Sequence, residues 1–357
     1  MKYPMLEIHL DKLTSNVKTL VNMCHVNHVT IMGVTKVFSG DPVIAKSYLD
    51  GGVAYLADSR IQNLKKLQGY VTKKVLLRLP MISEVEDVIR YSDISLNSEL
   101  DTISKLNEMA GQLKCRHQII LMIDLGDLRE GIWPSEFDVT INHIKKLDYI
   151  DLIGLGTNLT CLSAVLPTNE NLMQLQNLVE YLKDEHDICI EIISGGNSSS
   201  IYLLKNGEMP NMINNLRIGE GLVMGTEAAF QQEIDDTFHD IFILKAELIE
   251  VKYKPSSPIG TTGLDAFGCK PTIVDKGIRK RGLLAIGKQD VDYTSLIPLD
   301  DDITIIGSSS DHLAVDLTDS KISYKTGDVL SFNVKYVGVL NLTTSNYVTR
   351  RYVSGGI

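Results

Sequence analysis

The sequence lacks the long hydrophobic runs that membrane insertion requires. No apolar stretch in its 357 residues reaches the length of about 18 that marks a transmembrane helix. The first residues, MKYPMLEIHLDKL, carry a charge every few positions and contain no apolar core of the kind that secretory signals have. We therefore expect a cytoplasmic protein that neither crosses nor binds a membrane.

Cysteine is scarce and positive charge is in the minority. The five cysteines are widely spaced, odd in number and without a CxxC pair, which argues against a disulfide framework and against a zinc site. The chain has 35 Lys and Arg against 45 Asp and Glu, and its net charge of −10 repels the phosphate backbone of nucleic acids. The only tight basic run, Arg279-Lys280-Arg281, is typical of a solvated hairpin tip. Neither a metal ion nor a nucleic acid is expected as a ligand.

Short apolar, β-branched runs alternate with amphipathic, charge-bearing segments over the first two thirds of the chain. This alternation is typical of a parallel sheet covered by helices. Two of the helices are expected to begin at the N-caps Ser98 and Asn169. The eight expected strands are 29–36, 54–59, 74–80, 93–97, 119–126, 151–158, 188–196 and 215–222. Eight strand-helix units in this length predict a (β/α)8 TIM barrel over residues 11–235.

The pattern changes at about residue 236, where short strands follow one another between Gly, Pro, Asp and Ser turns. The run DVLSFNVKYVGVL, residues 328–340, is expected to be one of these strands, and no long helical period is visible. The first strand, at residues 5–10, precedes the barrel units. We therefore predict an α/β protein in which residues 1–10 and 236–357 form a second, antiparallel β domain.

Candidate chemistry lies where the barrel strands end, because active sites of TIM barrels lie at that end of the strands. The seventh strand runs into Ser194-Gly195-Gly196-Asn197-Ser198-Ser199-Ser200 and the eighth into Arg217-Ile218-Gly219-Glu220-Gly221, where glycine amides and hydroxyls can bind a phosphate. The first strand ends at Lys36, whose amine can form a Schiff base. A lysine opposite a phosphate site indicates pyridoxal 5′-phosphate as the cofactor.

Several short motifs, in this order and spacing, resemble the alanine racemase family of fold-type III pyridoxal-phosphate enzymes, and within it the ornithine racemase branch. They are Gly33-Val34-Thr35-Lys36, the run 57–67, Asp124-Leu125-Gly126 with Arg129, Gly195-Gly196-Asn197-Ser198, Arg217-Ile218-Gly219, and Ser310-Asp311-His312-Leu313 followed by Val315-Asp316-Leu317. The resemblance covers nearly the whole chain.

The resemblance implies a role for each matching residue. Lys36 matches the Schiff-base lysine, which also acts as an acid and base on the substrate Cα, and Arg217 matches the arginine that faces the pyridine nitrogen. Arg129 matches the arginine near the substrate carboxylate, and Asn158 stands where the family often has a histidine beside the cofactor ring. The residues implied in binding the phosphate are Gly196, Asn197, Ser198, Gly219 and, in a looser register, Tyr347.

Three departures from the family pattern affect this interpretation. No tyrosine follows Lys36 closely, and Met122 replaces the lysine whose modified form supports the arginine at position 129. Phe267 stands where the family has the tyrosine that acts as the second catalytic base. Racemisation needs proton-transfer groups on both faces of Cα, so another residue should replace that tyrosine. The candidates are Asp265, Cys269 and His312.

The sequence thus predicts a pyridoxal-phosphate-dependent racemase of ornithine or a similar basic amino acid. Asp290 and Asp311 are candidates for binding the distal ammonium of the substrate, a role that Asp265 could also take. The resemblance implies a homodimer in which the β domain completes the neighbour's active site. The alternatives are an alanine racemase, a D-threonine aldolase-like or decarboxylating lyase on the same scaffold, and a non-catalytic carrier of the cofactor.

Overall fold

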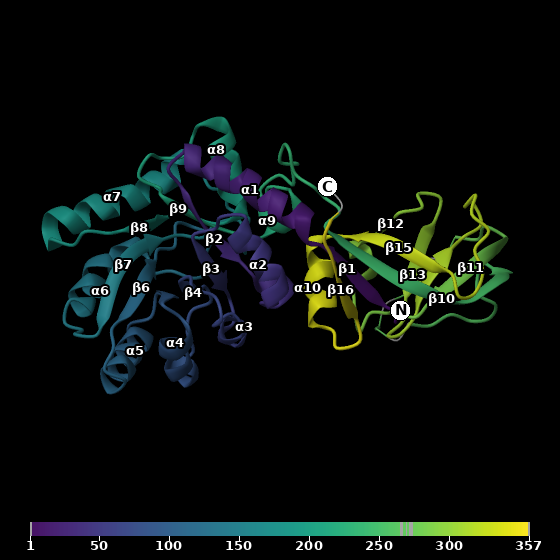
Figure 1. Cartoon of the computed structure of the whole chain (residues 1–357), viewed down its shortest axis with the longest axis horizontal. Helices are drawn as coiled ribbons and strands as arrows, with labels where there is room; N and C mark the ends of the chain where they lie inside the picture. The colour runs from purple at the N-terminus through teal and green to yellow at the C-terminus, as the bar shows by residue number, and fades with distance from the viewer. Residues whose placement is uncertain (1, 265–266, 269, 271–273, 356–357) are drawn as a thin grey trace. The chain divides into compact units, whose positions relative to one another are not determined.

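The computed structural model describes residues 2–264, 267–268, 270 and 274–355. Its contacts divide the chain into two compact units, which we call the barrel unit (Asp11–His239) and the β unit (Met1–Leu10 with Asp240–Ile357). Figure 1 shows the helices and strands of both units.

The barrel unit is a closed eight-stranded parallel barrel, as the sequence predicted. Its strands are β2 (Thr30–Val34), β3 (Tyr55–Asp58), β4 (Lys74–Leu76), β5 (Ile94–Asn97), β6 (His117–Met122), β7 (Ile150–Gly156), β8 (Ile192–Ser194) and β9 (Asn215–Ile218). Pairing of β2 with β9 closes the ring. All eight expected strands are present, although the expectation of 188–196 for the seventh was too long, since β8 has only three residues.

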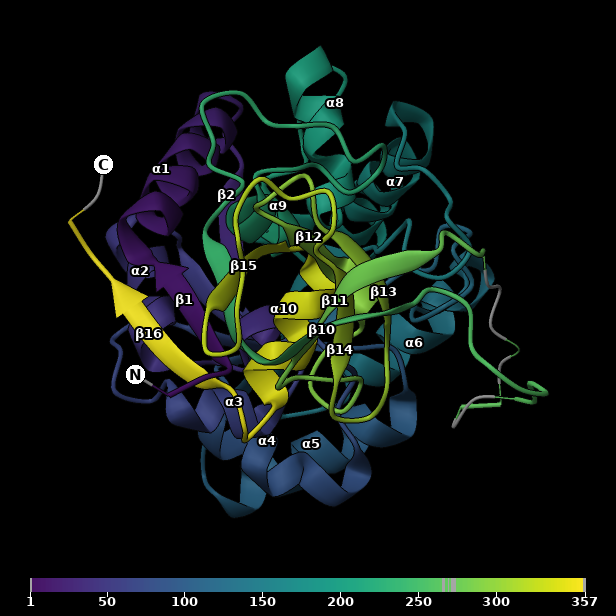
Figure 2. The ribbon, with the colours of Figure 1, turned by 90° about the vertical axis from the view of Figure 1, so that its right-hand side faces the viewer.

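Helices surround the barrel, as Figure 2 shows. They are α1 (Leu10–Val26), α2 (Pro42–Asp50), α3 (Ile61–Lys66), α4 (Val85–Tyr91), α5 (Leu100–Gln112), α6 (Phe137–Ile144), α7 (Asn169–His186), α8 (Ile201–Asn206) and α9 (Glu220–Met224). The expected N-caps were wrong by one residue. The Thr168 hydroxyl accepts a hydrogen bond from the Asn171 amide at the start of α7, and Glu99 holds the cap position of α5.

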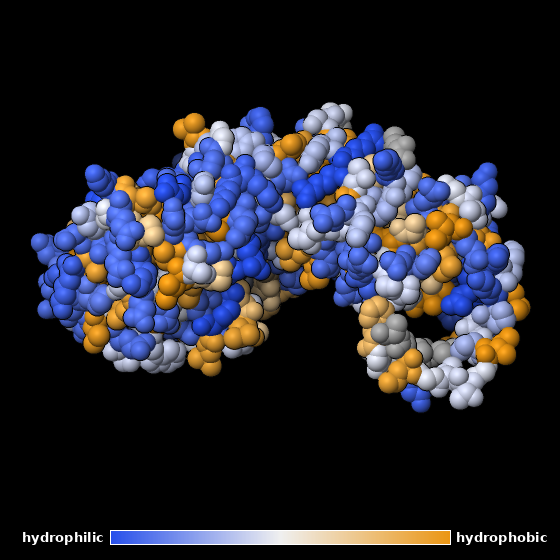
Figure 3. Space-filling view, turned by 90° about the horizontal axis from the view of Figure 1, so that it is seen from below, coloured by the Kyte–Doolittle hydropathy of each residue, from blue (hydrophilic) through white to orange (hydrophobic). Residues whose placement is uncertain are grey.

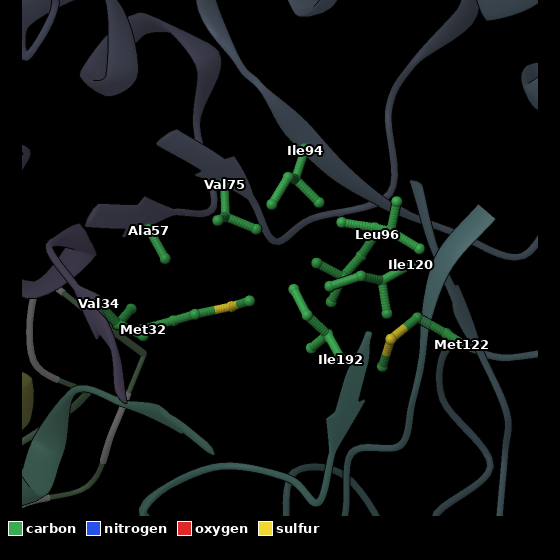
Figure 4. Close-up of a cluster of buried hydrophobic side chains, with 10 residues drawn as sticks. Met32, Val34, Ala57, Val75, Ile94, Leu96, Ile120, Met122 and Ile192 are labelled. Atoms are coloured by element: carbon green, nitrogen blue, oxygen red, sulfur yellow. The ribbon is translucent and has the colours of Figure 1, made fainter. Parts of the chain in front are cut away.

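The barrel interior is packed with aliphatic side chains and methionine. Figure 4 shows this cluster, in which β-branched residues such as Val75, Ile94 and Ile120 converge from different strands. Such a core fills the barrel, so that a ligand can bind only at one of its ends. On the face of the barrel unit that Figure 3 shows, hydrophilic residues predominate and hydrophobic ones are scattered.

The β unit is built on an eight-stranded sheet. Its strands are β1 (Met5–His9), β10 (Phe242–Pro255), β11 (Ile278–Leu284), β12 (Leu296–Pro298), β13 (Thr304–Ser308), β14 (Leu313–Asp316), β15 (Val329–Val334) and β16 (Thr349–Val353). The first strand of the chain pairs antiparallel with β10 and parallel with β16. The N-terminal segment is thereby tied into the sheet formed by the C-terminal third of the sequence.

One helix in the β unit was missed. The run expected to be a strand over 328–340 is β15 followed by α10 (Tyr336–Thr344). Its buried residues, Gly338, Val339, Leu342 and Thr343, recur at helical spacing. Burial of this face overrides the preference of its β-branched residues for strands. Among the described residues, no helix is both long enough and apolar enough to cross a membrane.

Candidate active site at the carboxyl ends of the barrel strands

Lys36 lies two residues beyond the end of β2, at the start of a 3-10 helix, η1 (Lys36–Phe38). The backbone around it is fixed, because Thr35 donates its amide to the Ala57 carbonyl at 2.8 Å and Val37 and Phe38 are fully buried. The lysine side chain itself is exposed. A rigid strand end therefore presents a solvent-accessible amine at the mouth of the barrel.

Two acidic residues, Asp58 and Glu220, interact electrostatically with the positive charge of Lys36. Burial raises the pKa of Asp58, an effect opposed by hydrogen bonds from Thr35, Asn63 and the Arg60 amide and by the charge of Lys36. The Thr35 hydroxyl donates to Asp58 at 2.6 Å, which fixes the loop that carries the lysine. Burial also raises the pKa of Glu220, a residue that the sequence interpretation had not singled out.

Hydrogen bonds centred on Ser198 join the loops after β8 and β9. The Ser198 hydroxyl accepts hydrogen bonds from the amides of Gly219 at 3.3 Å and Gly221 at 3.1 Å. Gly196 has a φ of +116°, and a Cβ there would lie 2.7 Å from the Ser200 hydroxyl, so only glycine fits this turn. The Ser199 hydroxyl is buried without a hydrogen-bond partner among the described residues. This buried hydroxyl, which is next to Ser198 in the chain, is suited to a phosphate oxygen.

Arg217, on β9, is a buried cation in the same end of the barrel, with 5% of its surface exposed. It donates to the Ser194 hydroxyl and to the Thr157 carbonyl, both at 2.6 Å. Burial lowers the pKa of Arg217 to about 10, while the negative charge of Glu130 opposes this change. The guanidinium therefore stays charged at neutral pH and can hold a ring nitrogen unprotonated.

Asn158 links Arg217 to the loop after β7. Its side-chain oxygen accepts hydrogen bonds from Arg217 at 3.4 Å and from the side-chain NH₂ group of Asn197 at 2.8 Å. Its own amide group donates to Glu130 at 3.3 Å and to the sulfur of Cys161 at 3.2 Å. The sequence interpretation treated Cys161 only as one of five scattered cysteines, and no local motif placed it beside Asn158.

Arg129 is paired with a neighbour that the sequence interpretation also missed. Its guanidinium contacts the Glu130 carboxylate, with Nη2 and Oε1 2.6 Å apart. Glu130 thus supplies a negative charge beside Arg129, although the supporting lysine of the family is replaced by Met122. This ion pair leaves the arginine about 40% exposed and able to receive a carboxylate.

The candidates from the C-terminal third lie in the β unit. Asp290 is buried and accepts a hydrogen bond from the Ser345 hydroxyl at 2.7 Å. It lines a hollow of about 560 Å³ together with Lys288, Asp292 and Asn341. Tyr347, two residues beyond Ser345, is mostly exposed and donates its amide to the Ser345 hydroxyl.

The remaining candidates of the C-terminal third are Asp311, His312, Asp265 and Cys269. Asp311 and His312 are exposed, and the Ser310 hydroxyl donates to Asp311 at 2.8 Å. The Lys288 ammonium lies 3.7 Å from the centroid of the Phe267 ring, a cation–π contact. Asp265 and Cys269 lie outside the described residues.

Comparison with known proteins identifies the family. The model of the N-terminal domain of alanine racemase matches residues 8–227, more than half of the chain.

The chain belongs to the alanine racemase family.

Two curated relatives match the chain along nearly its whole length. An ornithine racemase of Acetoanaerobium sticklandii is 48% identical over 98% of this chain and 99% of its own. A lysine racemase of Thermotoga maritima is 40% identical over 99% of both chains. The alanine racemase from Streptomyces lavendulae superposes over 100% of this chain and 99% of its own with a TM-score of 0.78 at 16% identity, which shows the shared fold.

Pyridoxal 5′-phosphate is the cofactor of this racemase-family chain. The residues at the mouth of the barrel fit it, because its aldehyde, its phosphate and its ring nitrogen each have a suitable counterpart there. The exposed Lys36 amine suits the aldehyde, the hydroxyls of Ser198 and Ser199 with the Gly219 amide suit the phosphate, and Arg217 suits the ring nitrogen.

Proposed function

We propose that the protein racemises ornithine, and more slowly lysine, using pyridoxal 5′-phosphate. The observation that supports this most is the near-complete match to an ornithine racemase and a lysine racemase, at 48% and 40% identity. The polar residues at the carboxyl end of the barrel support it independently, because they match the chemical groups of the cofactor.

Each of the residues at the barrel mouth has its own role in this proposal. Lys36 holds the cofactor through its amine and moves a proton on one face of the substrate Cα. Ser198, Ser199 and the Gly219 amide bind the phosphate, while Arg129, held by Glu130, binds the substrate carboxylate. When bound, the cofactor withdraws electrons from the substrate and so acidifies its Cα–H bond. Arg217 limits this withdrawal, because a permanent cation keeps the ring nitrogen unprotonated.

The side-chain ammonium of ornithine needs a carboxylate, and Asp290 is our candidate. It already accepts one hydrogen bond and borders an open hollow, so its second oxygen can receive an ammonium. Asp311 is a second candidate, and Tyr347 a candidate phosphate contact. Because the family resemblance assigns the β unit to the neighbour's site, the proposal includes a homodimer. The thiols of the four described cysteines are free, in keeping with a cytoplasmic location.

The proposal is tested by kcat/KM for racemisation of L-ornithine, L-lysine and L-alanine by the cofactor-loaded enzyme. We expect ornithine to be preferred, and Asp290→Asn to lower its kcat/KM by about 10- to 100-fold without lowering that of alanine. Asp328→Asn is the matched control, since Asp328 caps the Lys325 amide and does not line the hollow.

The same assay separates the alternatives. A preference for alanine would make the protein an alanine racemase, release of glycine from D-threonine would make it a lyase, and cofactor binding without turnover would make it a carrier. The dimer is tested by mixing Lys36→Ala with Asp290→Asn. Ornithine racemisation above that of either variant supports shared sites, and no gain contradicts them.

A further inference from the structure

Racemisation requires a second proton-transfer group, and Phe267 supplies none. Lys36 reaches Cα from one side only, so a group on the opposite face must exchange the other proton. This question rests on the proposed function. The described barrel unit offers an answer in the loop that follows β7.

Lys36 and Cys161 approach the mouth of the barrel from well-separated strands. Lys36 follows β2, whereas Cys161 follows β7, and β9 and β8 lie between them on the shorter path round the closed barrel. These two intervening strands carry Arg217 and the phosphate-binding serines. A ligand seated on those residues therefore has Lys36 on one side and the Cys161 loop on the other.

The loop that carries Cys161 is held rigidly by the buried Asp127. The Asp127 carboxylate accepts hydrogen bonds from the amides of Cys161 at 3.1 Å, Leu162 at 2.9 Å and Ser163 at 3.1 Å. Three amides bound to one carboxylate fix the backbone of this turn. A reacting group needs such preorganisation to stay within reach of its substrate atom.

The position of the sulfur is fixed by the cofactor-binding residues. Arg217 carries only hydrogen-bond donors, so Asn158 turns its oxygen toward Arg217 and its NH₂ group toward the sulfur, 3.2 Å away. The side-chain NH₂ group of Asn197 donates to the same sulfur at 3.4 Å. Cys161 is exposed, and these contacts use its sulfur as an acceptor, which leaves the S–H proton available for transfer.

Two further atoms point to a ligand at this place. The Thr157 hydroxyl, next to Asn158, and the Ser199 hydroxyl, two residues from Asn197, are both buried without a hydrogen-bond partner among the described residues. Cys24 differs from Cys161 because it lies in the core. Burial raises the pKa of the Cys24 thiol to about 12 and makes that thiol unreactive.

We propose that Cys161 is the catalytic acid and base on the face of Cα opposite Lys36, and that both groups come from the same subunit. In one direction the Cys161 thiolate takes the Cα proton and becomes a thiol, while the Lys36 ammonium delivers its proton to the other face. In the return direction the thiol gives up its proton and the Lys36 amine accepts one. No oxidant or further reactant is needed.

The test compares Cys161→Ala and Cys161→Ser with Cys115→Ala, whose exposed thiol precedes β6 at the other end of the barrel. We expect Cys161→Ala to lower racemisation of both enantiomers by at least about 100-fold. In deuterated water, Lys36 should still exchange the Cα proton of one enantiomer with retention of configuration. Cys115→Ala should behave as the wild type.

A second readout does not depend on turnover. Iodoacetamide should label Cys161 in the cofactor-free protein, as measured by mass spectrometry of its peptide, and pyridoxal phosphate should protect it at least several-fold. Labelling of Cys115 should not change. The visible absorption of the bound cofactor should be the same in Cys161→Ala and in the wild type.

Three outcomes would overturn the assignment: full racemisation by Cys161→Ala, equal loss of exchange for both enantiomers, or labelling of Cys161 that the cofactor does not affect. Loss of racemisation in Asp265→Asn, Cys269→Ala or His312→Gln with full activity in Cys161→Ala would place the second group in the β unit instead. A wild type that binds the cofactor and racemises no amino acid would contradict the proposed function, and the protection of Cys161 would still be measured separately.

Discussion

Both ends of the barrel are rich in polar side chains, but the two ends differ in whether these side chains have hydrogen-bond partners within the protein. At the amino end, His117 at the start of β6 is buried with its Nε2 2.8 Å from the Ser95 hydroxyl, and Lys74 at the start of β4 donates to the Tyr70 carbonyl. At the carboxyl end, the Thr157 and Ser199 hydroxyls are buried and have no hydrogen-bond partner in the described part of the chain, and Lys36 is exposed.

This difference implies that polar residues at the amino end stabilise the fold, whereas those at the carboxyl end serve ligand binding and the reaction. Polar groups that bind each other stabilise the fold, whereas polar groups left for a ligand contribute to folding only when the ligand is bound. Substitutions at the carboxyl end should therefore change activity more than stability, and substitutions at the amino end should do the reverse.

The largest effect is expected for Lys36→Ala. Removing the amine that holds the cofactor should lower racemisation by on the order of 10⁴-fold or more. The exposed side chain contributes little to packing, so the Tm of the cofactor-free protein should stay close to that of the wild type. Activity assays and thermal unfolding check both expectations. A large fall in Tm would contradict the expectation that substitutions at the carboxyl end change activity more than stability.

Arg217→Gln should lower kcat by about 100-fold or more, because it removes the fixed charge at the cofactor ring. Arg217→Lys keeps a positive charge but loses the forked geometry that reaches Ser194 and Thr157, so its loss should be smaller than that of the glutamine variant. Steady-state kinetics on both variants give the comparison. Equal activity of the two would show that the charge itself has no role.

At the amino end, His117 should make stability depend on pH. Burial lowers the pKa of His117 to about 4, below the unfolded value near 6.5. Between these values the unfolded chain binds a proton that the folded chain does not. Acidification from pH 6.5 to 4 should therefore cost about 3 kcal/mol of unfolding free energy. Denaturant unfolding of the wild type and His117→Gln measures it, and an equally steep loss in the variant would contradict the assignment.

The smallest effect is expected for Arg116→Gln, also at the amino end. Arg116 and Asp151 form a largely exposed ion pair, and such pairs contribute up to about 1 kcal/mol. The variant should therefore unfold at nearly the same denaturant concentration and racemise at the wild-type rate. A clear loss of activity would show that the amino end also affects the chemistry.

Much of the fold could be predicted from local patterns. The barrel strands are short β-branched runs such as 30–34 and 94–97, bounded by turns, and this pattern depends only on neighbouring residues. The helix α10 was missed because Val337, Val339 and Thr343 favour strands locally, and only the burial of one face, a property of the folded chain, makes the segment helical.

The site was predictable where a short motif defines it and not where the chain must fold first. Lys36, Ser198 and Arg217 stand in compact motifs at strand ends. The contact between Asn158 and Cys161 depends on Asp127, which binds the Cys161 amide from 34 residues away in sequence. No periodicity or spacing encodes such a contact.

Borohydride reduction shows whether the carboxyl end of the barrel holds pyridoxal 5′-phosphate on Lys36. The cofactor-loaded protein is reduced, digested and sequenced by mass spectrometry. We expect the added mass of a phosphopyridoxyl group on the peptide that contains Lys36, and no added mass in Lys36→Ala. A modified peptide carrying another lysine, or no modified peptide, would contradict it.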